Sequence, residues 1–176
     1  MTEEIICEAI TVLRLKKIDF IVSPYETDSQ LSKLWVDGYI DYVITEDSDL
    51  ILYGCKKILY KLSEEGECDY LNLSEDRNKN MNESVYIKSF LSFSEEKQIM
   101  ACVMAGCDYI PSIKGIGLKK AIKYFEQFDN ITDIVGKMCQ EAAFKDRIPQ
   151  DYVQNATNAS LIFKHALIFN LKTGKL

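Results

Sequence analysis

The sequence predicts an α/β fold: an incomplete, mostly parallel sheet flanked by helices, followed by a helical hairpin subdomain. In the first half, segments with helical spacing of apolar residues alternate with short β-branched runs, which is the order of a parallel sheet covered by helices. From residue 94 onward the apolar residues recur only at helical spacing. The 176 residues are 47 % hydrophobic and 27 % charged, a globular composition. We therefore divide the chain into an α/β region, 1–92, and a helical region, 93–176.

The first four predicted elements alternate between helix and strand. Residues 3–15 place apolar side chains at helical spacing, and two lysines follow where the helix dipole favours cations. Residues 18–22 are β-branched and aromatic and stop at Ser23-Pro24, which predicts a buried strand. A helix through residues 31–38 and a strand over residues 42–44 follow. Short links between these elements favour parallel strands joined by helices.

The remaining elements include an antiparallel pair and then only helices. Residues 57–62 and 68–73 flank a charged turn and predict two antiparallel strands at the sheet edge. Residues 74–84 are rich in Asn and charge, which predicts a loop or linker. Ser94 is the expected N-cap of a helix that ends at Gly106. Further helices are expected to begin at Leu118, over residues 131–139 and over residues 151–169.

Charge and cysteine spacing exclude several classes of protein. The chain carries 21 Lys and Arg against 27 Asp and Glu, so any contact with nucleic acid must come from a local basic patch. Six cysteines occur singly, without the spacing of a zinc finger, and we expect reduced, mostly buried thiols. An acidic start and the lack of a long apolar run predict neither a secretory signal nor a membrane span.

Acidic residues follow the ends of two predicted strands and of one predicted helix. The carboxyl ends of parallel strands are where α/β sheets bind ligands, which makes the first two positions candidate sites. The third position, just past a helix C-terminus, is one where the helix dipole disfavours an anion. The candidate residues are Glu26, Asp28, Asp47, Asp49 and Asp108.

These carboxylates lack cationic neighbours along the chain. No Lys or Arg lies between Lys17 and Lys33, or between Lys33 and Lys56. Two carboxylates ~6 Å apart at an effective dielectric of ~20 repel by roughly 3 kcal/mol, so a cation is expected between them. Mg²⁺ prefers carboxylate oxygens, and two ions ~4 Å apart are typical of in-line phosphodiester attack. Two alternatives stay open: the first pair of acids stabilises a helix start, and the second pair is a solvated loop.

A basic hairpin is the second candidate site, within residues 106–125. Four lysines and no acid lie between Tyr109 and Phe125. Two glycines at a helix start let the backbone approach a phosphate, which binds the free N–H groups without reading the sequence of bases. The alternative is a tight turn with solvated lysines. The candidate phosphate-binding residues are Lys114, Gly115, Gly117, Lys119 and Lys120.

Four ordered segments resemble the structure-specific 5′ nucleases of the flap endonuclease and XPG family. They are residues 23–31 (SPYETDSQL), 44–50 (ITEDSDL), 106–109 (GCDY) and 115–117 (GIG). Residues 53–57 (YGCKK) and 148–152 (IPQDY) look most like the exonuclease 1 branch. The resemblance extends over residues 18–171 and implies a PIN-like 5′ nuclease core.

The resemblance assigns roles to the candidate residues. It implies that Glu26, Asp28, Asp47, Asp49 and Asp108 bind two Mg²⁺ or Mn²⁺ ions, which supply hydroxide as the nucleophile. It implies that the hairpin holds duplex DNA with 5′ ends, flaps or nicks, and that carbonyls near Ser112 and Ile116 bind a monovalent cation, K⁺. It also implies a role in DNA repair or recombination and location in the nucleus.

One departure from the family lowers the activity that we expect. Family members carry a first strand, two further metal-binding aspartates and a basic helical arch before the region matched here, and none of these precedes residue 18. The sheet would then expose an edge, and the metal site would lack ligands. We therefore expect this chain by itself to bind Mg²⁺ weakly and to cut DNA poorly or not at all, unless an N-terminal nuclease segment is supplied elsewhere.

Two other functions compete with the nuclease hypothesis. The first is a non-catalytic duplex-DNA-binding remnant of the same family, in which the lysines bind phosphates and the carboxylates do no chemistry. The second is a Mg²⁺-dependent phosphatase of the haloacid dehalogenase type, because Asp47-Ser48-Asp49 after a strand mimics its D-x-D motif. The phosphatase hypothesis leaves Glu26, Asp28 and the glycine hairpin unexplained.

Overall fold

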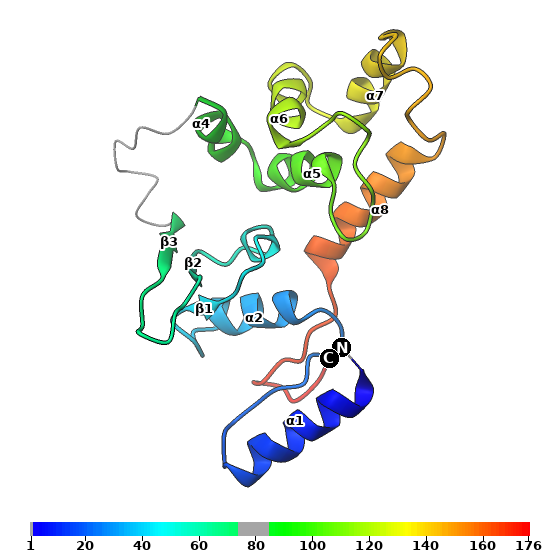
Figure 1. Ribbon diagram of the computed structural model, residues 1–176. Coiled ribbons are helices and arrows are strands. Elements are labelled where there is room, and N and C mark those ends of the chain that lie inside the picture. Colours follow the sequence, from blue (N-terminus) through cyan, green and yellow to red (C-terminus); the bar gives the residue numbers. More distant parts are fainter. Residues whose placement is uncertain (1, 74–84) are drawn as a thin grey trace.

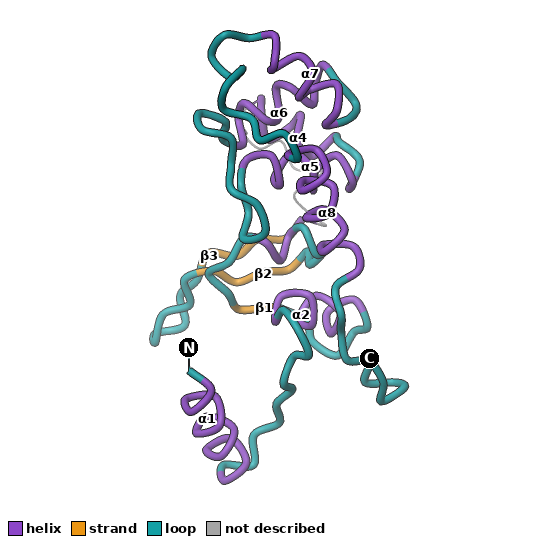
Figure 2. The backbone as a smooth tube through the Cα atoms, turned by 90° about the vertical axis from the view of Figure 1, so that its right-hand side faces the viewer, coloured by secondary structure: helices purple, strands orange, loops and turns teal. Residues whose placement is uncertain are grey.

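The computed structural model describes residues 2–73 and 85–176, so the predicted loop at 74–84 lies outside the described residues. Figure 1 shows a small sheet with helix α2 beside it, a group of helices on one side and helix α1 on the other. Figure 2 shows the same three layers from the side. The predicted α/β class is confirmed.

The sheet has three described strands, β1 (Val43–Ile44), β2 (Lys57–Tyr60) and β3 (Asp69–Asn72), in that order. β1 pairs with β2 in parallel, with Val43 opposite Ile58. β2 pairs with β3 antiparallel, with Ile58 opposite Leu71. The predicted antiparallel edge is confirmed, and the described sheet is mixed, with one parallel and one antiparallel pair.

Helix α2 (Thr27–Val36) packs on this sheet and positions its acidic ends. The core beneath it is small and comprises Val43, Leu50, Cys55 and Ile58, with Leu31 and Trp35 packed against them. A 3-10 helix, η1 (Asp49–Ile51), follows β1 and places Leu50 fully inside this core. Burial of such side chains, at roughly 25 cal/mol per Å² of apolar surface, holds the segment that carries Asp49.

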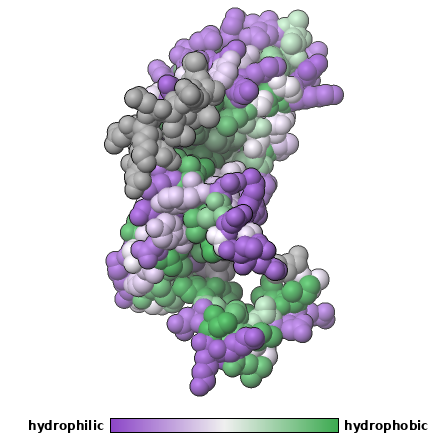
Figure 3. Space-filling model, turned by 60° about the vertical axis from the view of Figure 1, so that its left-hand side comes forward, coloured by the Kyte–Doolittle hydropathy of each residue, from purple (hydrophilic) through white to green (hydrophobic). Residues whose placement is uncertain are grey.

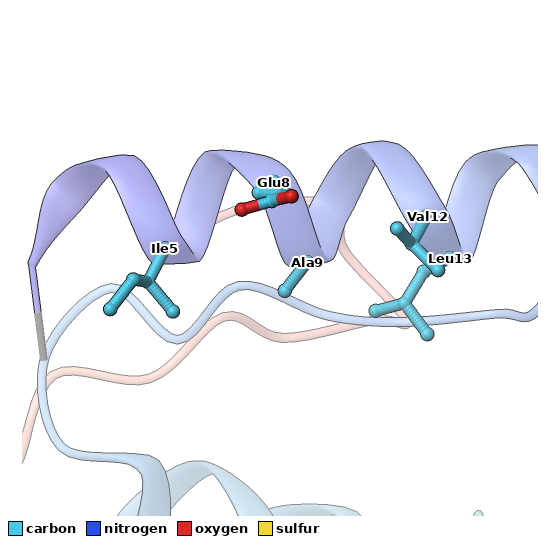
Figure 4. Close-up of a pocket in the computed structure, with 5 residues that line it drawn as sticks. All are labelled: Ile5, Glu8, Ala9, Val12 and Leu13. Carbon is cyan, nitrogen blue, oxygen red and sulfur yellow. The ribbon is translucent and has the colours of Figure 1, made fainter.

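Helix α1 (Glu3–Leu15) forms as predicted, but none of its residues is buried. Ile5 is 54 % exposed and Leu15 is 79 % exposed. An open groove of about 430 Å³ follows its apolar side along Ile5, Ala9, Val12 and Leu13, as Figure 4 shows. Apolar side chains are accordingly exposed on the lowest part of the molecule, which carries α1 (Figure 3).

The predicted strand at residues 18–22 is wrong. The segment has no regular structure and pairs with none of the described strands. Ile18 is 50 % and Val22 is 59 % exposed, although both have the side chains of a buried strand. A strand needs a neighbour for its backbone hydrogen bonds, and side-chain pattern alone does not supply one.

The helical half comprises α4 (Val85–Ser92), α5 (Glu95–Ala105), α6 (Leu118–Gln127), α7 (Ile131–Gln140) and α8 (Tyr152–His165). α5 lies centrally and packs against α6 and α8, and α4 packs against α6. Ser94 caps α5 as predicted, because its Oγ accepts a hydrogen bond from the Lys97 amide. Helix α4 was not expected from the sequence, and the division at residue 92 stays a prediction.

The C-terminal segment is bound to the α/β half by the side chain of Gln30. The Gln30 Oε1 atom accepts a hydrogen bond of 2.7 Å from the Phe169 amide. The Gln30 Nε2 atom donates to the Phe169 carbonyl at 3.0 Å. The Gln30 amide therefore pairs with Phe169 as a strand neighbour would, and α8 ends at His165, earlier than residue 169.

All six cysteines are free, but the expectation that most are buried is wrong. Cys55 is buried, Cys102 and Cys107 are half-buried, and Cys7, Cys68 and Cys139 are exposed. The three exposed cysteines lie at surface positions, where core packing does not require a buried side chain. No helix in the described part of the chain is long and apolar enough to cross a membrane.

Candidate functional site

Asp47 and Asp49 are held by a turn after strand β1. The Asp47 amide donates to Thr45 Oγ1 at 2.9 Å. The Asp47 Oδ1 atom in turn accepts from the Asp49 amide at 2.9 Å. Asp49 then begins η1, whose next residue, Leu50, is fully buried. The Asp47 carboxylate is thus held by a local hydrogen bond, and the buried Leu50 fixes the backbone next to Asp49.

Glu26 and Asp28 lie at the N-terminus of α2. Glu26 is the N-cap residue, but its side chain makes no capping hydrogen bond. Ser29 Oγ donates to the Glu26 carbonyl at 2.9 Å, and Ser29 is buried, so the backbone here is fixed. Asp28, in the first turn, interacts favourably with the helix dipole. The helix-start interpretation therefore accounts for the place of Asp28 and leaves the Glu26 carboxylate unexplained.

Asp108 lies in a tight turn after α5. Cys107 and Ile110 exchange backbone hydrogen bonds of 3.2 Å and 3.3 Å, which places Asp108 and Tyr109 in the turn between them. Gly106 makes the turn possible, because its φ of +111° is a conformation that L side chains rarely adopt. Asp108 is exposed. The helical half thus contributes one carboxylate to a site whose other members come from the α/β half.

The carboxylates interact electrostatically across these three segments. Burial, followed by the charges of Asp47, Asp108 and Asp28, raises the pKa of Asp49 to about 6. Burial, followed by the charges of Asp47, Glu26 and Asp108, raises the pKa of Asp28 above its usual range. Within the described ranges, none of the five forms a salt bridge with Lys, Arg or His. The fold thus places these acidic side chains within electrostatic range of one another, and no described Lys, Arg or His neutralises them.

The donor set fits a hard divalent cation by chemistry and charge. All five groups offer carboxylate oxygens, the ligands that Mg²⁺ and Mn²⁺ prefer. Over residues 2–73 and 85–176, however, no three His, Cys, Asp or Glu side chains are close enough to hold one ion.

Two tyrosines join the carboxylate-bearing segments, and the sequence analysis assigned them no role. The Tyr53 and Tyr109 hydroxyls lie 2.9 Å apart in a hydrogen bond between the two halves of the chain. Both rings pack on Phe163 of α8, with centroid distances of 5.1 Å for Tyr53 and 5.4 Å for Tyr109. Burial raises the pKa of both hydroxyls, so both stay protonated at neutral pH. Their spacing along the sequence gave no signal of this contact.

The glycine hairpin forms a tight turn before α6. Gly115 has a φ of +93°, and Gly117 is the N-cap of α6. The Lys120 ammonium donates to the Gly115 carbonyl at 2.7 Å, so it buttresses the turn. The Lys119 ammonium lies 5.9 Å from the centre of the Tyr86 ring of α4. Lys114 is exposed. The five predicted phosphate-binding residues therefore lie on one turn and the first turn of one helix.

Arg147 is a cation at this hairpin that the sequence analysis missed. Its Nη1 atom lies 3.9 Å from the position that a Cβ atom on Gly115 would occupy. Arg147 is exposed and forms no salt bridge with any described acidic residue. It is the only arginine in the helical half, at residues 93–176, and that was the one signal available in the sequence.

The residues expected near a monovalent cation lie on the same turn. Ser112 is exposed and lies against Gly106, whereas the side chain of Ile116 is buried. The Ile116 amide donates to the Ile113 carbonyl at 2.8 Å. A cavity of about 240 Å³ is lined among others by Asp49, Gly106 and Leu118, the first residue of α6. One candidate carboxylate and the start of the helix after the hairpin thus border a common cavity.

Comparison with known proteins identifies the family. The XPG I-region family matches residues 17–108. Exonuclease 1 of Xenopus laevis is 35 % identical over 181 residues, which cover 100 % of this chain and 23 % of that protein. Exonuclease 1 of Danio rerio is 34 % identical over 93 % of this chain and 20 % of its own length. The chain thus spans roughly a fifth to a quarter of these relatives.

Solved structures share the fold. The catalytic core of Rad2 in complex with DNA substrate has a TM-score of 0.69 at 19 % identity, over 96 % of this chain and 57 % of that one. The Holliday junction-resolving enzyme GEN1 in complex with product DNA and Mg²⁺ has a TM-score of 0.64 at 20 % identity, over 95 % and 44 % of the two chains. GEN-1 binding with potassium has a TM-score of 0.66 at 20 % identity, over 98 % and 46 %.

These matches decide between the hypotheses drawn from the sequence. The phosphatase hypothesis, which explained only Asp47 and Asp49, is superseded, since the family region spans all three acidic segments up to residue 108. The relatives at 35 % and 34 % identity both bear the name exonuclease 1, as the segments at residues 53–57 and 148–152 indicated. The chain belongs to the XPG family of 5′ nucleases and is exonuclease 1-like.

Proposed function

We propose that the chain forms the metal-binding and duplex-binding part of a 5′ exonuclease and flap endonuclease that hydrolyses DNA phosphodiester bonds in repair or recombination. One observation carries the proposal: charges on three segments distant in sequence act on the Asp28 and Asp49 carboxylates, and none of the five acids has a cationic partner among the described residues. Membership of the XPG family supports the reaction class. Nuclear location is part of the same proposal.

The proposed metal ligands are Glu26, Asp28, Asp47, Asp49 and Asp108. Two bound Mg²⁺ or Mn²⁺ ions would polarise the scissile phosphate and activate water, which is the usual chemistry of such carboxylate sites. Thr45 and the Asp49 amide orient Asp47, and the buried Leu50 fixes the backbone of Asp49. The chain itself supplies no nucleophile in this proposal. GEN1, with the same fold, has been solved with Mg²⁺ and product DNA.

The proposed DNA contacts are phosphate contacts. Lys114, Lys119 and the backbone at Gly115 and Gly117 would bind one strand, and Arg147 extends this cationic surface on the other side of Gly115. Such contacts position a duplex without reading its bases. Rad2, with the same fold, has been solved with DNA substrate. The proposed substrates are duplexes with 5′ ends, flaps or nicks.

A monovalent cation at the hairpin is the remaining part of the proposal. GEN-1, with the same fold, has been solved with potassium. In this chain the backbone carbonyls near Ser112 and Ile116 are the groups proposed to bind K⁺. Duplex affinity is then expected to be higher in KCl than in LiCl of the same concentration, because Li⁺ is too small for carbonyls spaced for K⁺. Equal affinities in the two salts would contradict this part.

The substitution Asp47→Ala tests the nuclease proposal. With an N-terminal nuclease segment supplied to the chain, metal-dependent cleavage of a labelled duplex with a recessed or flapped 5′ end is expected to disappear, while duplex binding in a gel-shift assay survives. The control is Asp41→Ala, which removes an exposed aspartate just before β1 that belongs to no candidate site. Cleavage that persists in Asp47→Ala at the wild-type rate would contradict the assignment of the site.

The non-catalytic alternative keeps one observation in its favour. In the described part of the chain, no three acidic, His or Cys side chains are close enough to hold one ion. The wild-type chain supplied with an N-terminal nuclease segment decides between the two functions. Duplex binding without cleavage in either Mg²⁺ or Mn²⁺ then favours a DNA-binding remnant, and metal-dependent cleavage favours the nuclease.

A further inference from the structure

Tyr53 makes one hydrogen bond to each of the three segments that carry the carboxylates. Its hydroxyl bonds with the hydroxyl of Tyr109, the residue directly after Asp108, at 2.9 Å. Its amide donates to the Asp49 carbonyl at 3.2 Å. Its carbonyl accepts from Ser32 Oγ of helix α2, the helix whose first turn holds Asp28, at 2.5 Å. One residue therefore links the backbones that bear Asp28, Asp49 and Asp108.

Two of these links are local, and only the third crosses between the halves of the chain. The bonds to Asp49 and Ser32 join parts of the α/β half, which α2 and η1 already hold together by packing. The hydroxyl bond to Tyr109 joins this half to the turn after α5. Phe163 of α8 packs on both tyrosine rings and fixes their planes. The hydroxyl pair and its aromatic support therefore hold the Asp108 turn directly against the segment that follows Asp49, next to the packing of Leu52 in the core of the helical half.

A contact of this kind is needed because the carboxylates repel one another. All five side chains are carboxylates, and none of them forms a salt bridge with a described Lys, Arg or His. A hydrogen bond between two neutral hydroxyls adds no charge to the site and still holds the two segments together. Groups that orient metal ligands without touching the ion commonly change its affinity tenfold or more.

We propose that Tyr53 and Tyr109 are positioning residues: their hydroxyl pair sets the distance of Asp108 from Asp28 and Asp49, and with it the affinity of the site for a divalent cation. This inference rests on the proposed function, because it concerns the same carboxylate site. It adds two residues that neither bind the ion nor belong to the hairpin.

Mn²⁺ binding to the full 176-residue chain, followed by the loss of the free-ion EPR signal, is the test. Tyr53→Phe and Tyr109→Phe each retain the ring on Phe163 and remove one hydroxyl, and each is expected to weaken Mn²⁺ binding about tenfold. The double variant is expected to bind no more weakly than either single variant, since either substitution already breaks the pair. Tyr152→Phe is the matched control, because its buried hydroxyl has no hydrogen-bond partner in the described structure.

The outcomes separate this inference from the proposed function. A wild-type chain that binds no Mn²⁺ contradicts both. A wild-type chain that binds Mn²⁺, with unchanged affinity in both Phe variants, contradicts only the positioning role. Losses that multiply in the double variant also overturn it, because they show two independent effects. A lower midpoint of thermal unfolding with unchanged Mn²⁺ affinity assigns the pair to stability alone and likewise contradicts the proposal.

Discussion

Gly106 and Ser112 lie so close that a Cβ atom on residue 106 would be 2.9 Å from the Cβ of Ser112 and 3.2 Å from its amide nitrogen. Gly106 also has a φ of +111°. The turn that holds Asp108 is therefore closed by a backbone contact that only glycine permits. Because the proposed K⁺ ligands follow on the same turn, this contact links the geometry of the acidic site to that of the hairpin.

Gly106→Ala is expected to lower the free energy of unfolding by about 2 kcal/mol or more, from backbone strain and from collision with Ser112. Chemical denaturation measures the loss. Gly38→Ala is the control for strain alone, because Gly38 also has a positive φ but no atom within 4 Å of its added Cβ. In the double variant with Ser112→Gly, only the part of the stability loss that comes from collision with the Ser112 side chain is expected to be recovered. Equal losses of unfolding free energy for Gly106→Ala and Gly38→Ala would contradict the prediction that collision with Ser112 adds to the strain.

Asp49→Asn is expected to stabilise the metal-free chain at pH 7. The pKa of Asp49 in the folded chain is about 6, above its usual 3.8. Folding therefore takes up protons between about pH 4 and pH 6, and stability falls as the pH rises through this range. Removing the charge should raise the free energy of unfolding at pH 7 by about 1 kcal/mol, after allowance for screening by water, and by nearly nothing at pH 4.

Thermal or urea unfolding in the presence of a chelator measures this pH dependence. Asp146→Asn, at an exposed position outside the site, is the matched control and should show no such difference between pH 4 and pH 7. In the presence of Mn²⁺ the sign reverses, because the wild-type chain gains stability from the ion and the variant does not. Destabilisation by Asp49→Asn at pH 7 in chelator would show that the carboxylate is already neutralised.

The paired substitution of Lys119 and Lys120 by Glu is expected to weaken duplex binding equally for all base sequences. Each lost phosphate contact lowers the salt slope of log K by about 0.9, so the slope should fall by up to about 2. Fluorescence anisotropy across a series of KCl concentrations measures it. The charge-matched control substitutes Lys16 and Lys17, which follow α1. An unchanged slope would assign the hairpin lysines to a solvated turn.

The Lys120 ammonium already donates a hydrogen bond to the Gly115 carbonyl. The single substitutions of Lys119 and Lys120 by Ala are therefore expected to affect duplex binding differently. Lys119→Ala should remove one phosphate contact and change the salt slope. Lys120→Ala should instead loosen the Gly115 turn, so its duplex affinity falls with a smaller change in slope. A larger change in the salt slope for Lys120→Ala than for Lys119→Ala would show that the Lys120 ammonium leaves Gly115 when DNA binds.

Gln30→Ala is expected to release the C-terminal segment. The substitution removes both hydrogen bonds that the Gln30 amide makes to Phe169 and leaves that residue's N–H and C=O without their partner. Two such bonds contribute roughly 1–3 kcal/mol together. Amide hydrogen exchange at Phe169 should accelerate by about tenfold or more. Gln154→Ala, which removes a local bond to Asn158 on the exposed face of α8, is the control. Unchanged protection at Phe169 would contradict the role of Gln30.

Local signals predicted most of the regular structure, because they act within a few residues. Ser94 followed by two acids predicted the start of α5, and its Oγ does cap the helix. The alternation of apolar residues predicted α1 and α6. The same kind of signal failed at residues 18–22, since a strand requires a hydrogen-bonding neighbour as well as an apolar pattern. Helix α4 was missed because its β-branched and aromatic residues are poor helix formers outside their packing on α6.

Sequence patterns alone identify the groups that carry the chemistry: five acids without cationic neighbours, four lysines around two glycines, and the ordered motifs of one family. Long-range packing sets how far the acids interact, brings Tyr53 to Tyr109 and Gln30 to Phe169, and places Arg147 beside Gly115. The partners in these contacts are 32 to 139 residues apart in the chain. Local propensity cannot specify such contacts, because chain folding and core packing must first bring the residues together.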